Sequence, residues 1–350
     1  MSVTIDPFGW RQLTDVVNNL ETSPSFLQKF FPAAPLWATP NIQVDVEVGG
    51  RKLAPIVKRD GKAANITKDG FKTQTFETPR IRQKASFTAQ DLLGNRAAGM
   101  PVYNPTGALV ANSKEAKIAA ALRQMKDQVM RRLEWMAAGA FAGGFTYTGD
   151  DFEFTIDYQM PAANKPTLTS TAKWDAPTTA LPLDNFRAWK RIVARATGLN
   201  ASVAIMSYEA ITYMLATTQV QTLIKLGGGL NIGDVRLDAN PTAGLGSSYE
   251  ATYIGTFAGV KCYQYDGAYV DSAGAEQPII PVDKVILFAP DSNLRTHYGA
   301  IEDLDAGTIV APFFSKDWTT KDPSALWLLT ESSPLPVPHK PAGIVYADVY

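Results

Sequence analysis

The chain has 350 residues, 45% of them hydrophobic and 19% charged, which excludes disorder of the whole chain. This length is enough for about two globular units with buried cores. Its 33 basic and 34 acidic side chains nearly cancel, so it lacks the positive field by which proteins attract nucleic acid or anionic membranes. A single cysteine excludes an intramolecular disulfide and fits a reducing cytoplasm. With no signal-peptide pattern and no apolar run of about 18 residues, we expect a soluble protein that is not exported.

Two short apolar segments come first in the chain. The earlier one, within residues 8–31, has helix-like apolar spacing at Leu13, Val16, Val17 and Leu20. After Ser23-Pro24-Ser25, the second contains Phe26, Leu27, Phe30 and Phe31. Such an arm packs onto its own domain, the commoner outcome, or onto a neighbouring subunit, and the sequence does not distinguish the two. Phe30 and Phe31 are therefore candidates for contact with a neighbour.

A strand and a basic hairpin follow. Residues 42–48 alternate strictly between apolar and polar side chains, which is typical of a half-buried strand. Residues 51–84 contain ten basic and three acidic side chains and two Asp-Gly turn pairs, which predict a long, locally positive hairpin. Such a hairpin needs a partner surface, unless it is a solvated edge that blocks unwanted strand pairing. Its candidate interface residues are Arg59, Lys62 and Lys68.

The clearest helix begins near Asn112 or Ser113 and ends near Phe141, before Gly143-Gly144. Its apolar positions recur every three or four residues: Ile118, Leu122, Met125, Val129, Leu133, Met136 and Ala140. The remaining faces carry charged side chains, Lys126 and Glu134 among them. This pattern predicts a long surface helix laid across a sheet, in preference to a helix lying on a membrane.

A second α/β unit is predicted farther along. Helices capped by Asp184 and Ser207 extend to Gly198 and Gly227, with a strand at 203–206 between them. Residues 227–246 suggest an irregular loop, and 253–265 and 285–288 suggest strands. Short strands joined by loops are expected over 145–183.

Residues that commonly carry chemistry are sparse. The two histidines, His297 and His339, have no partner at metal-ligand spacing, and Cys262 lies in a predicted strand without a reactive motif. Glu302, Asp303 and Asp305 lack the glycine and distal glutamate of a calcium loop, so a solvated or subunit-facing acidic edge is the preferred interpretation. We expect no catalytic, cofactor or metal site.

Several ordered motifs lie in the last third of the chain. They are Tyr265-Asp266-Gly267-Ala268-Tyr269-Val270, Leu294-Arg295-Thr296-His297-Tyr298-Gly299, Asp303-Leu304-Asp305-Ala306, residues 316–323 (KDWTTKDP) and residues 331–336 (ESSPLP). This series resembles the major capsid protein E family of lambda-like phages. The resemblance extends over nearly the whole chain and is weakest at 227–246 and 147–182.

The resemblance implies an α+β protein with the Hong Kong 97 capsid fold. The expected parts are an N-terminal arm (1–41), an extended β-hairpin (42–90), a peripheral domain with a long spine helix (91–183), an axial domain (184–298) and a return to the peripheral domain (299–350). The family also implies that shell expansion acts as a conformational switch.

In function, the resemblance implies a structural protein, not an enzyme, which forms hexamers and pentamers of an icosahedral shell around double-stranded DNA without reading its sequence. Expected partners are further copies of the chain, a portal protein, sometimes a decoration protein, and a scaffolding protein that is separate because no long charged helix follows Met1. Expected locations are the virion and, during assembly, the host cytoplasm. The charge asymmetry predicts that the basic hairpin lies on a neighbour's acidic residues, at 302–305 or Asp317.

Two other interpretations stay open. An encapsulin-like compartment with the same fold would house an enzyme in place of a genome. A soluble hydrolase or sugar-binding domain would need a pocket of converging carboxylates or aromatics, for which Trp318 and Trp327 are candidates, although packing is their commoner role.

Overall fold

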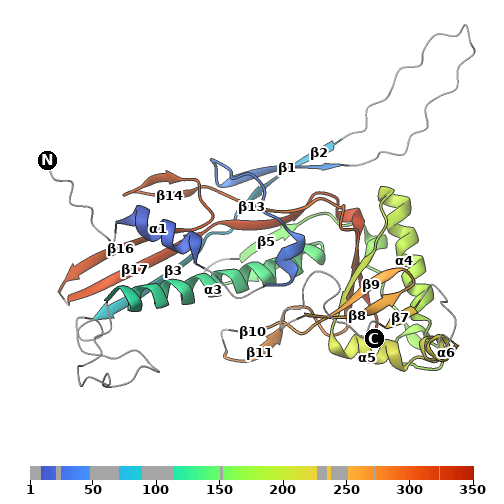
Figure 1. The fold of residues 1–350 in the computed structure, drawn as a ribbon. Helices are drawn as coiled ribbons and strands as arrows, with labels where there is room; N and C mark the ends of the chain where they lie inside the picture. Colours follow the sequence, from blue (N-terminus) through green and yellow to red (C-terminus); the bar gives the residue numbers. More distant parts are fainter. Residues whose placement is uncertain are drawn as a thin grey trace, which may run out of the picture.

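The computed structural model describes residues 9–20, 25–47, 71–88, 114–149, 153–226, 235–237, 251–271, 273–322 and 324–350. The molecule is elongated (Figure 1). Its long part contains the helix α3 (Lys114–Phe141) beneath a three-stranded sheet, and its compact part contains a six-stranded sheet with three helices. The predicted α+β class is confirmed.

Helix α3 agrees with the predicted spine helix in position and in its buried face. All seven residues of its predicted apolar stripe are buried. The end nearer Lys114 packs against an antiparallel sheet with the strand order β16 (Phe314–Lys321), β17 (Ser324–Ser332) and β3 (Ile81–Thr88). Leu326 and Leu328 of β17 meet this stripe in one apolar cluster.

The predicted hairpin divides between two sheets. Strand β1 (Asn41–Glu47) pairs antiparallel with β2 (Phe71–Glu77), from Asn41 opposite Glu77 to Glu47 opposite Phe71. Strand β3, which we expected within the hairpin at 42–90, pairs instead with β17. The reason is its alternation, because Ile81, Ala85 and Phe87 pack with the cluster on α3, which a free hairpin would leave in water.

The compact part is built on a sheet with the order β19 (Ile344–Asp348), β12 (Lys284–Phe288), β6 (Val203–Met206), β9 (Val260–Tyr265), β8 (Ala251–Phe257) and β7 (Val235–Leu237). Only β6 and β9 are parallel among these neighbours. The three helices are α4 (Pro182–Thr197), α5 (Tyr208–Ala216) and α6 (Thr218–Leu226). Strand β19 lies in the segment 299–350, for which we expected a return to the peripheral domain, and it pairs with β12 of this sheet.

Three local predictions for the compact part need correction. The helix expected from Ser207 to Gly227 is two helices, because Thr217 adopts an extended conformation between them. The strand expected at 253–265 is two strands joined by a turn at Ala258-Gly259, both with positive φ. Asp184 lies in the first turn of α4 and Leu181 is its N-cap, because Pro182 already begins the helix. Ser207 does cap α5, since its Oγ accepts a hydrogen bond from Ala210 N.

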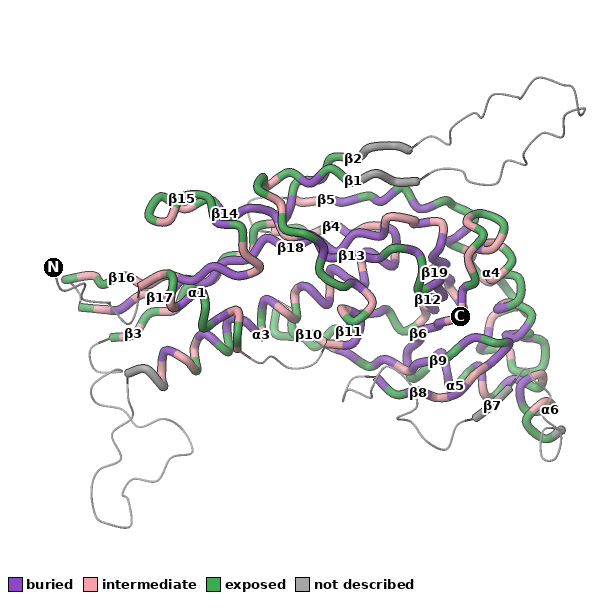
Figure 2. Tube along the Cα trace, turned by 45° about the horizontal axis from the view of Figure 1, so that its top comes forward, coloured by how far each residue is buried: buried purple, intermediate pink, exposed green. Residues whose placement is uncertain are grey.

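Shorter elements complete the fold. They are α1 (Trp10–Asn19), the 3₁₀ turns η1 (Leu27–Phe30), η2 (Ala162–Asn164), η3 (Ser170–Ala172) and η4 (Pro341–Gly343), and the antiparallel pairs β4 (Gly144–Thr148) with β5 (Glu153–Asp157), β10 (Ala268–Val270) with β11 (Glu276–Pro278), β13 (Leu294–Tyr298) with β18 (Pro334–Pro338), and β14 (Ile301–Asp303) with β15 (Gly307–Ile309). Figure 2 shows burial along β18, β12 and one side of α3, whereas the β14–β15 hairpin is mostly exposed. No helix in the described ranges is long and apolar enough to cross a membrane.

Candidate assembly surfaces

The N-terminal arm packs onto its own chain. Phe26 and Leu27 are fully buried and Phe31 is 3% exposed. The rings of Phe30 and Phe31 both contact Phe141 at the end of α3, and Phe30 also contacts Phe288 of the compact sheet. The structure therefore favours the first of the two outcomes considered for this arm. Of the two predicted contact residues, only Phe30 keeps part of its side chain accessible.

Two charged residues of α3 hold this arm, and both are buried where the sequence suggested solvent. Lys126 is 5% exposed, and its Nζ donates to the backbone oxygens of Val17 at 2.6 Å, Leu20 at 2.8 Å and Asn18 at 3.2 Å. These are the last carbonyls of α1, where a cation is favoured by the helix dipole. Burial lowers the pKa of Lys126, with Asp127 acting in the opposite direction.

Glu134 acts at the other end of the arm. It is 2% exposed; its Oε1 accepts from Leu27 N at 2.6 Å and its Oε2 from Gln28 N at 3.2 Å. Tyr265 OH of the compact sheet donates to Oε1 at 3.2 Å. Glu134 thus joins the arm, α3 and β9. No pattern in the sequence indicates this role, because apolar periodicity marks the buried face of a helix and leaves the partner of a charged residue unspecified.

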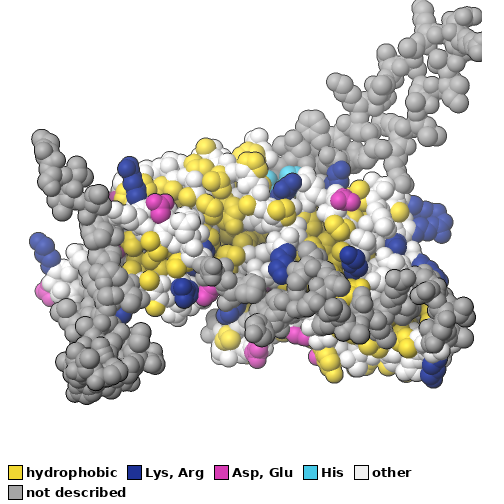
Figure 3. Space-filling model, in the orientation of Figure 1, with side chains coloured by type: hydrophobic (Ala, Val, Ile, Leu, Met, Phe, Trp, Pro, Cys, Tyr) yellow, Lys and Arg dark blue, Asp and Glu magenta, His cyan; other side chains and the backbone are white. Residues whose placement is uncertain are grey.

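A shallow groove lies beside the arm. It has a volume of about 540 Å³, and its walls include Lys29 and Phe30 of the arm, Lys261 and Tyr263 of β9, and Phe288. Apolar side chains gather across the middle of the face shown in Figure 3, with basic side chains at separate points around them. The residues that line the groove in the described part of the chain are apolar side chains, two lysines, a tyrosine and a serine, with no carboxylate among them.

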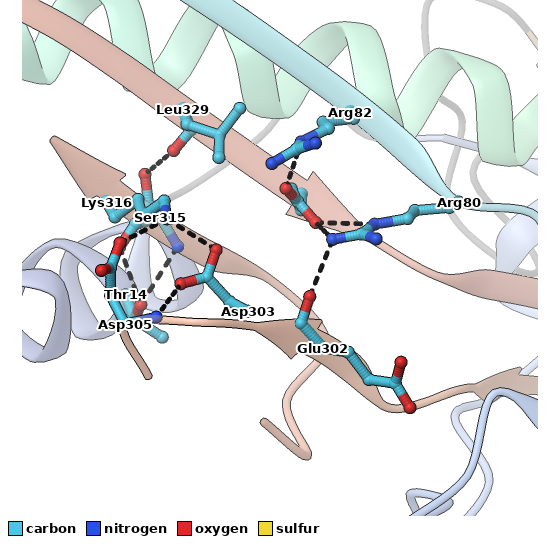
Figure 4. A network of polar contacts seen from close by, with 10 residues as sticks. Thr14, Arg80, Arg82, Glu302, Asp303, Asp305, Ser315, Lys316 and Leu329 are labelled. Carbon is cyan, nitrogen blue, oxygen red and sulfur yellow. Dashed lines mark hydrogen bonds and ion pairs between the residues drawn. The ribbon is translucent and has the colours of Figure 1, made fainter. Parts of the chain in front are cut away.

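The predicted acidic residues lie on the β14–β15 hairpin (Figure 4). Lys316 Nζ is 2.7 Å from Asp303 Oδ2 and 2.7 Å from Asp305 Oδ2. Burial raises the pKa of Asp303, but hydrogen bonds from Lys316 and two backbone N–H groups outweigh it and leave the pKa below its ordinary value. The Asp303 side chain is 4% exposed and is neutralised within the chain, so an open acidic edge consists of Glu302 and the 73% exposed Asp305.

The base of the β1–β2 hairpin is anchored to the same region. Arg80 and Arg82 both form ion pairs with Glu331, which is fully buried, and Arg80 also donates to the backbone oxygen of Glu302 at 3.0 Å (Figure 4). Next to them, Thr78 Oγ1 accepts from Ser333 Oγ at 2.7 Å and donates to Pro40 O at 2.8 Å. These contacts place the hairpin base within reach of the acidic hairpin of its own chain.

The basic residues predicted for the hairpin, Arg59, Lys62 and Lys68, lie outside the described residues. Their pairing with residues 302–305 of a neighbour stays a prediction. Asp317, the other acidic candidate, lies on β16 and is half-buried. The geometry brings Asp303 and Asp305 together and leaves Glu302 pointing away from Lys316 (Figure 4).

Trp318 and Trp327 form a pair on the outer face of the three-stranded sheet. Their ring centroids are 6.2 Å apart with planes 9° from parallel, and Lys84 Nζ lies 5.1 Å from the Trp327 ring. Trp318 is 39% exposed. Because the partners on this face are a lysine and neighbouring strand residues, packing across strands accounts for the pair.

The sparse reactive residues occupy structural positions. Cys262 is fully buried, and burial raises the pKa of its thiol, which keeps it protonated and unreactive. The two histidines meet in space: His297 Nε2 lies 3.1 Å from His339 Nε2. The sequence missed this pair, because the strands β13 and β18 that align the two residues are far apart in the chain. Among the described residues, no three His, Cys, Asp or Glu side chains group as a metal site would require.

Comparison with known proteins identifies the family. A family model described as phage major capsid protein E matches residues 9–349. A crystal structure described as a capsid protein of a prophage from E. coli CFT073 is 19% identical, has a TM-score of 0.72, and aligns over 98% of this chain and 99% of its own.

Two further structures share the fold. The mature capsid of bacteriophage PhiM1 is 12% identical with a TM-score of 0.53, covering 94% of this chain and 88% of its own. A phage-related protein of Bordetella bronchiseptica RB50 is 14% identical with a TM-score of 0.51, covering 96% and 95%. No match was found among curated proteins. The fold is that of Hong Kong 97-like capsid proteins, and the chain belongs to the phage major capsid protein E family.

Proposed function

We propose that this capsid protein builds an icosahedral shell of hexamers and pentamers around a double-stranded DNA genome. The observation that carries the proposal is the family match over residues 9–349, together with a capsid fold that aligns along nearly the entire chain. Members of this family are structural proteins of the phage capsid. The work of such a protein is the binding free energy summed over many repeated interfaces between copies.

The two parts of the molecule correspond to two positions in the shell. In this proposal the long part, with α3 and the β16–β17–β3 sheet, is the peripheral domain, and the compact part is the axial domain near the symmetry axes. The predicted boundary at 299 is then modified by β19, which pairs in the compact sheet, and the predicted hairpin end at 90 by β3, which pairs with β17 in the long part.

Contact between neighbours is proposed to use the extended hairpin and the acidic edge. Residues 51–70 carry six of the ten basic side chains of the hairpin region, including Arg59, Lys62 and Lys68. Glu302 and Asp305 supply exposed negative charge on the β14–β15 hairpin. Opposite charges at such a contact set its register and its rate of formation more than its affinity. Phe30 and the groove beside it are a second, apolar candidate.

The remaining partners follow from the family and from charge. We propose a separate scaffolding protein, a portal protein and, in some shells, a decoration protein, with assembly in the host cytoplasm. The net charge of −1 suits a wall that confines DNA and releases it, because tight contacts to many phosphates would oppose release. An encapsulin-like compartment is the alternative, and cargo in place of DNA would distinguish it.

Electron microscopy tests the central proposal. The full chain is expressed alone and with its candidate scaffold, and the products are examined in negative stain. Closed shells of uniform diameter are the expected result. A monomer in both preparations, over a range of salt and protein concentrations, would overturn the proposal.

A charge swap tests the proposed contact. Changing Glu302 to Lys should reduce shell yield while the subunit stays folded, because this carboxylate is exposed. Adding R59E and K62E to the same chain should restore part of the yield, since the signs are then opposite again. The matched control is Glu276→Lys on exposed β11, which makes the same charge change elsewhere. Loss of yield in the control, or no rescue by the swap, would count against this contact.

A further inference from the structure

The only two histidines of the chain belong to one hydrogen-bonded chain of rings that includes the arm. Trp37 Nε1 donates to His297 Nδ1 at 3.0 Å, and His297 Nε2 lies 3.1 Å from His339 Nε2. His297 is 5% exposed, on strand β13, and His339 directly follows β18, which pairs with β13. The three rings therefore join the arm to two strands that are both remote from it in the sequence.

The direction of these bonds fixes the protons. An indole N–H can only donate, so Nδ1 of His297 must be an unprotonated acceptor. Neutral His297 then carries its proton on Nε2 and donates it to Nε2 of His339, which must be unprotonated there. The tautomers are Nε2–H for His297 and Nδ1–H for His339. Both rings are neutral in this arrangement.

A proton added to either ring breaks the arrangement. On His339 it would enter at Nε2 and point at the N–H of His297; on His297 it would enter at Nδ1 and point at the indole N–H. Among the described residues, the charges that act on His297 are those of His339 and Arg295, which are cationic or able to become so and therefore do not offset an added proton on His297. Burial, with these charges, lowers the pKa of His297 to about 4.

The same arrangement disfavours a metal ion between the rings. A histidine that binds a metal through Nε2 normally keeps a proton on Nδ1 and donates it to an acceptor. Here Nδ1 of His297 already accepts from Trp37. Metal at Nε2 would require this ring to lose its one N–H proton and become an imidazolate, or Trp37 to leave.

The arm segment at Trp37 is held mainly through β13. Ala34 N donates to Thr296 O at 2.8 Å, Trp37 N to Tyr298 O at 3.0 Å, and Thr296 N to Pro32 O at 3.0 Å. Two side-chain contacts belong to the same attachment: Thr296 Oγ1 donates to Phe31 O at 3.0 Å, and Trp37 donates to His297. A positive charge placed between the arm and β13 would act directly on these bonds.

We propose that His297 and His339 form a proton-sensitive latch, which holds residues 32–39 of the arm on β13 while both rings are neutral and loosens them when either is protonated. The latch is a property of the single subunit and does not rest on shell formation. Its consequence is that acidification exposes backbone of β13 and the arm without unfolding the rest of the chain.

Hydrogen exchange followed by mass spectrometry tests the latch on the full, unassembled chain. After correction for the intrinsic effect of pH, peptides that cover residues 32–39 should lose protection by about tenfold or more between neutral pH and about pH 4. Peptides from β12 in the compact sheet should keep theirs. The double variant His297→Asn, His339→Gln should stay protected at both pH values, because neither replacement titrates and the Asn amide oxygen can accept from Trp37.

A second measurement keeps the proposal testable if that variant does not fold. With two histidines in the chain, ¹⁵N-histidine labelling gives two assignable rings, and their nitrogen shifts report the tautomers directly. The Nε2–H form of His297 with the Nδ1–H form of His339 is expected at neutral pH. Opposite tautomers, arm protection that does not change with pH, or the same acid-induced loss in the double variant would each overturn the latch.

Discussion

The long and compact parts of this molecule are stabilised in different ways. The cluster that packs the compact sheet against its helices contains 23 buried apolar residues, among them Phe186 and Trp189 of α4, whose rings contact each other. The three charged residues that are buried in the described chain, Lys126, Glu134 and Glu331, all lie in the long part. Their partners are segments distant in sequence: α1, η1 and the residues before β3.

This difference reflects how each part is assembled. The compact part buries broad apolar faces of a sheet and three helices, and the polar side chains buried in it, such as Ser207, are uncharged. The long part gathers narrow segments onto α3 and one sheet, each with a small apolar contact. Charge-assisted hydrogen bonds at helix ends and at the hairpin base stabilise the attachment of these segments. They also fix how each segment aligns with α3 or the sheet, which the small apolar contacts do not. The following variants test whether the two parts respond as differently as this account requires.

The largest effect is expected in the compact core. Phe186 is fully buried between Trp174 and Trp189, so the substitution Phe186→Ala should lower the free energy of unfolding by about 3–5 kcal/mol. Urea unfolding measures it. Leu304, at 105% exposure on the β14–β15 turn, is the control, and its change to Ala should have almost no effect. A loss below about 1 kcal/mol at Phe186 would mean that apolar packing does not dominate this part.

A pH-dependent loss comes next, through His297 in the long part. Its folded-state pKa of about 4 lies below the ordinary 6.5, so between these values the unfolded chain binds more protons than the folded one. The contribution of neutral His297 to the free energy of unfolding is complete above pH 6.5, declines as pH falls, and is gone below about pH 4. Its full size is on the order of 3 kcal/mol. Urea unfolding over a pH series should show this decline, and the His297→Asn variant should lack it; equal declines in both chains would assign the effect to carboxylates.

Loss of the Glu134 carboxylate should cost less. The change Glu134→Ala leaves the Leu27 and Gln28 N–H groups and Tyr265 OH without this acceptor. It should lower the free energy of unfolding by about 2 kcal/mol. Glu134→Gln keeps the shape and one oxygen, and should lose roughly half as much. Hydrogen exchange at η1 should increase in both variants while exchange in the compact sheet stays unchanged. An equal increase in the two regions would show that Glu134 supports the whole chain and not only the arm.

The same contrast explains what the sequence could predict. The stripe of α3, the strands β1, β6 and β12 and the Ser207 cap follow from local spacing, and all appear as predicted. The fold family followed from ordered motifs over residues 265–336. Burial of Lys126 and Glu134, the pairing of β3 with β17, and the meeting of His297 with His339 depend on partners about 40 to 250 residues away, which local periodicity does not specify. The burial of the Asp303 side chain could not be predicted either, because its partner Lys316 lies on a different strand, β16.

The smallest effect is expected at that ion pair. Asp303 has a lowered pKa in the folded chain, so it contributes stability that is present above its ordinary value of 3.8 and is lost as pH falls through the lower folded value. Lys316→Met removes the cation but keeps the apolar stem, and should cost about 1 kcal/mol at neutral pH. Because the lost interaction requires an ionised Asp303, the difference from the unchanged chain should vanish at acid pH. The exposed Lys321 on the same strand is the matched control, and its change to Met should have no measurable effect at any pH. A deficit for Lys316→Met that persists with Asp303 protonated would indicate that the lysine acts by packing, and the β14–β15 hairpin would then resemble the compact part in how it is held.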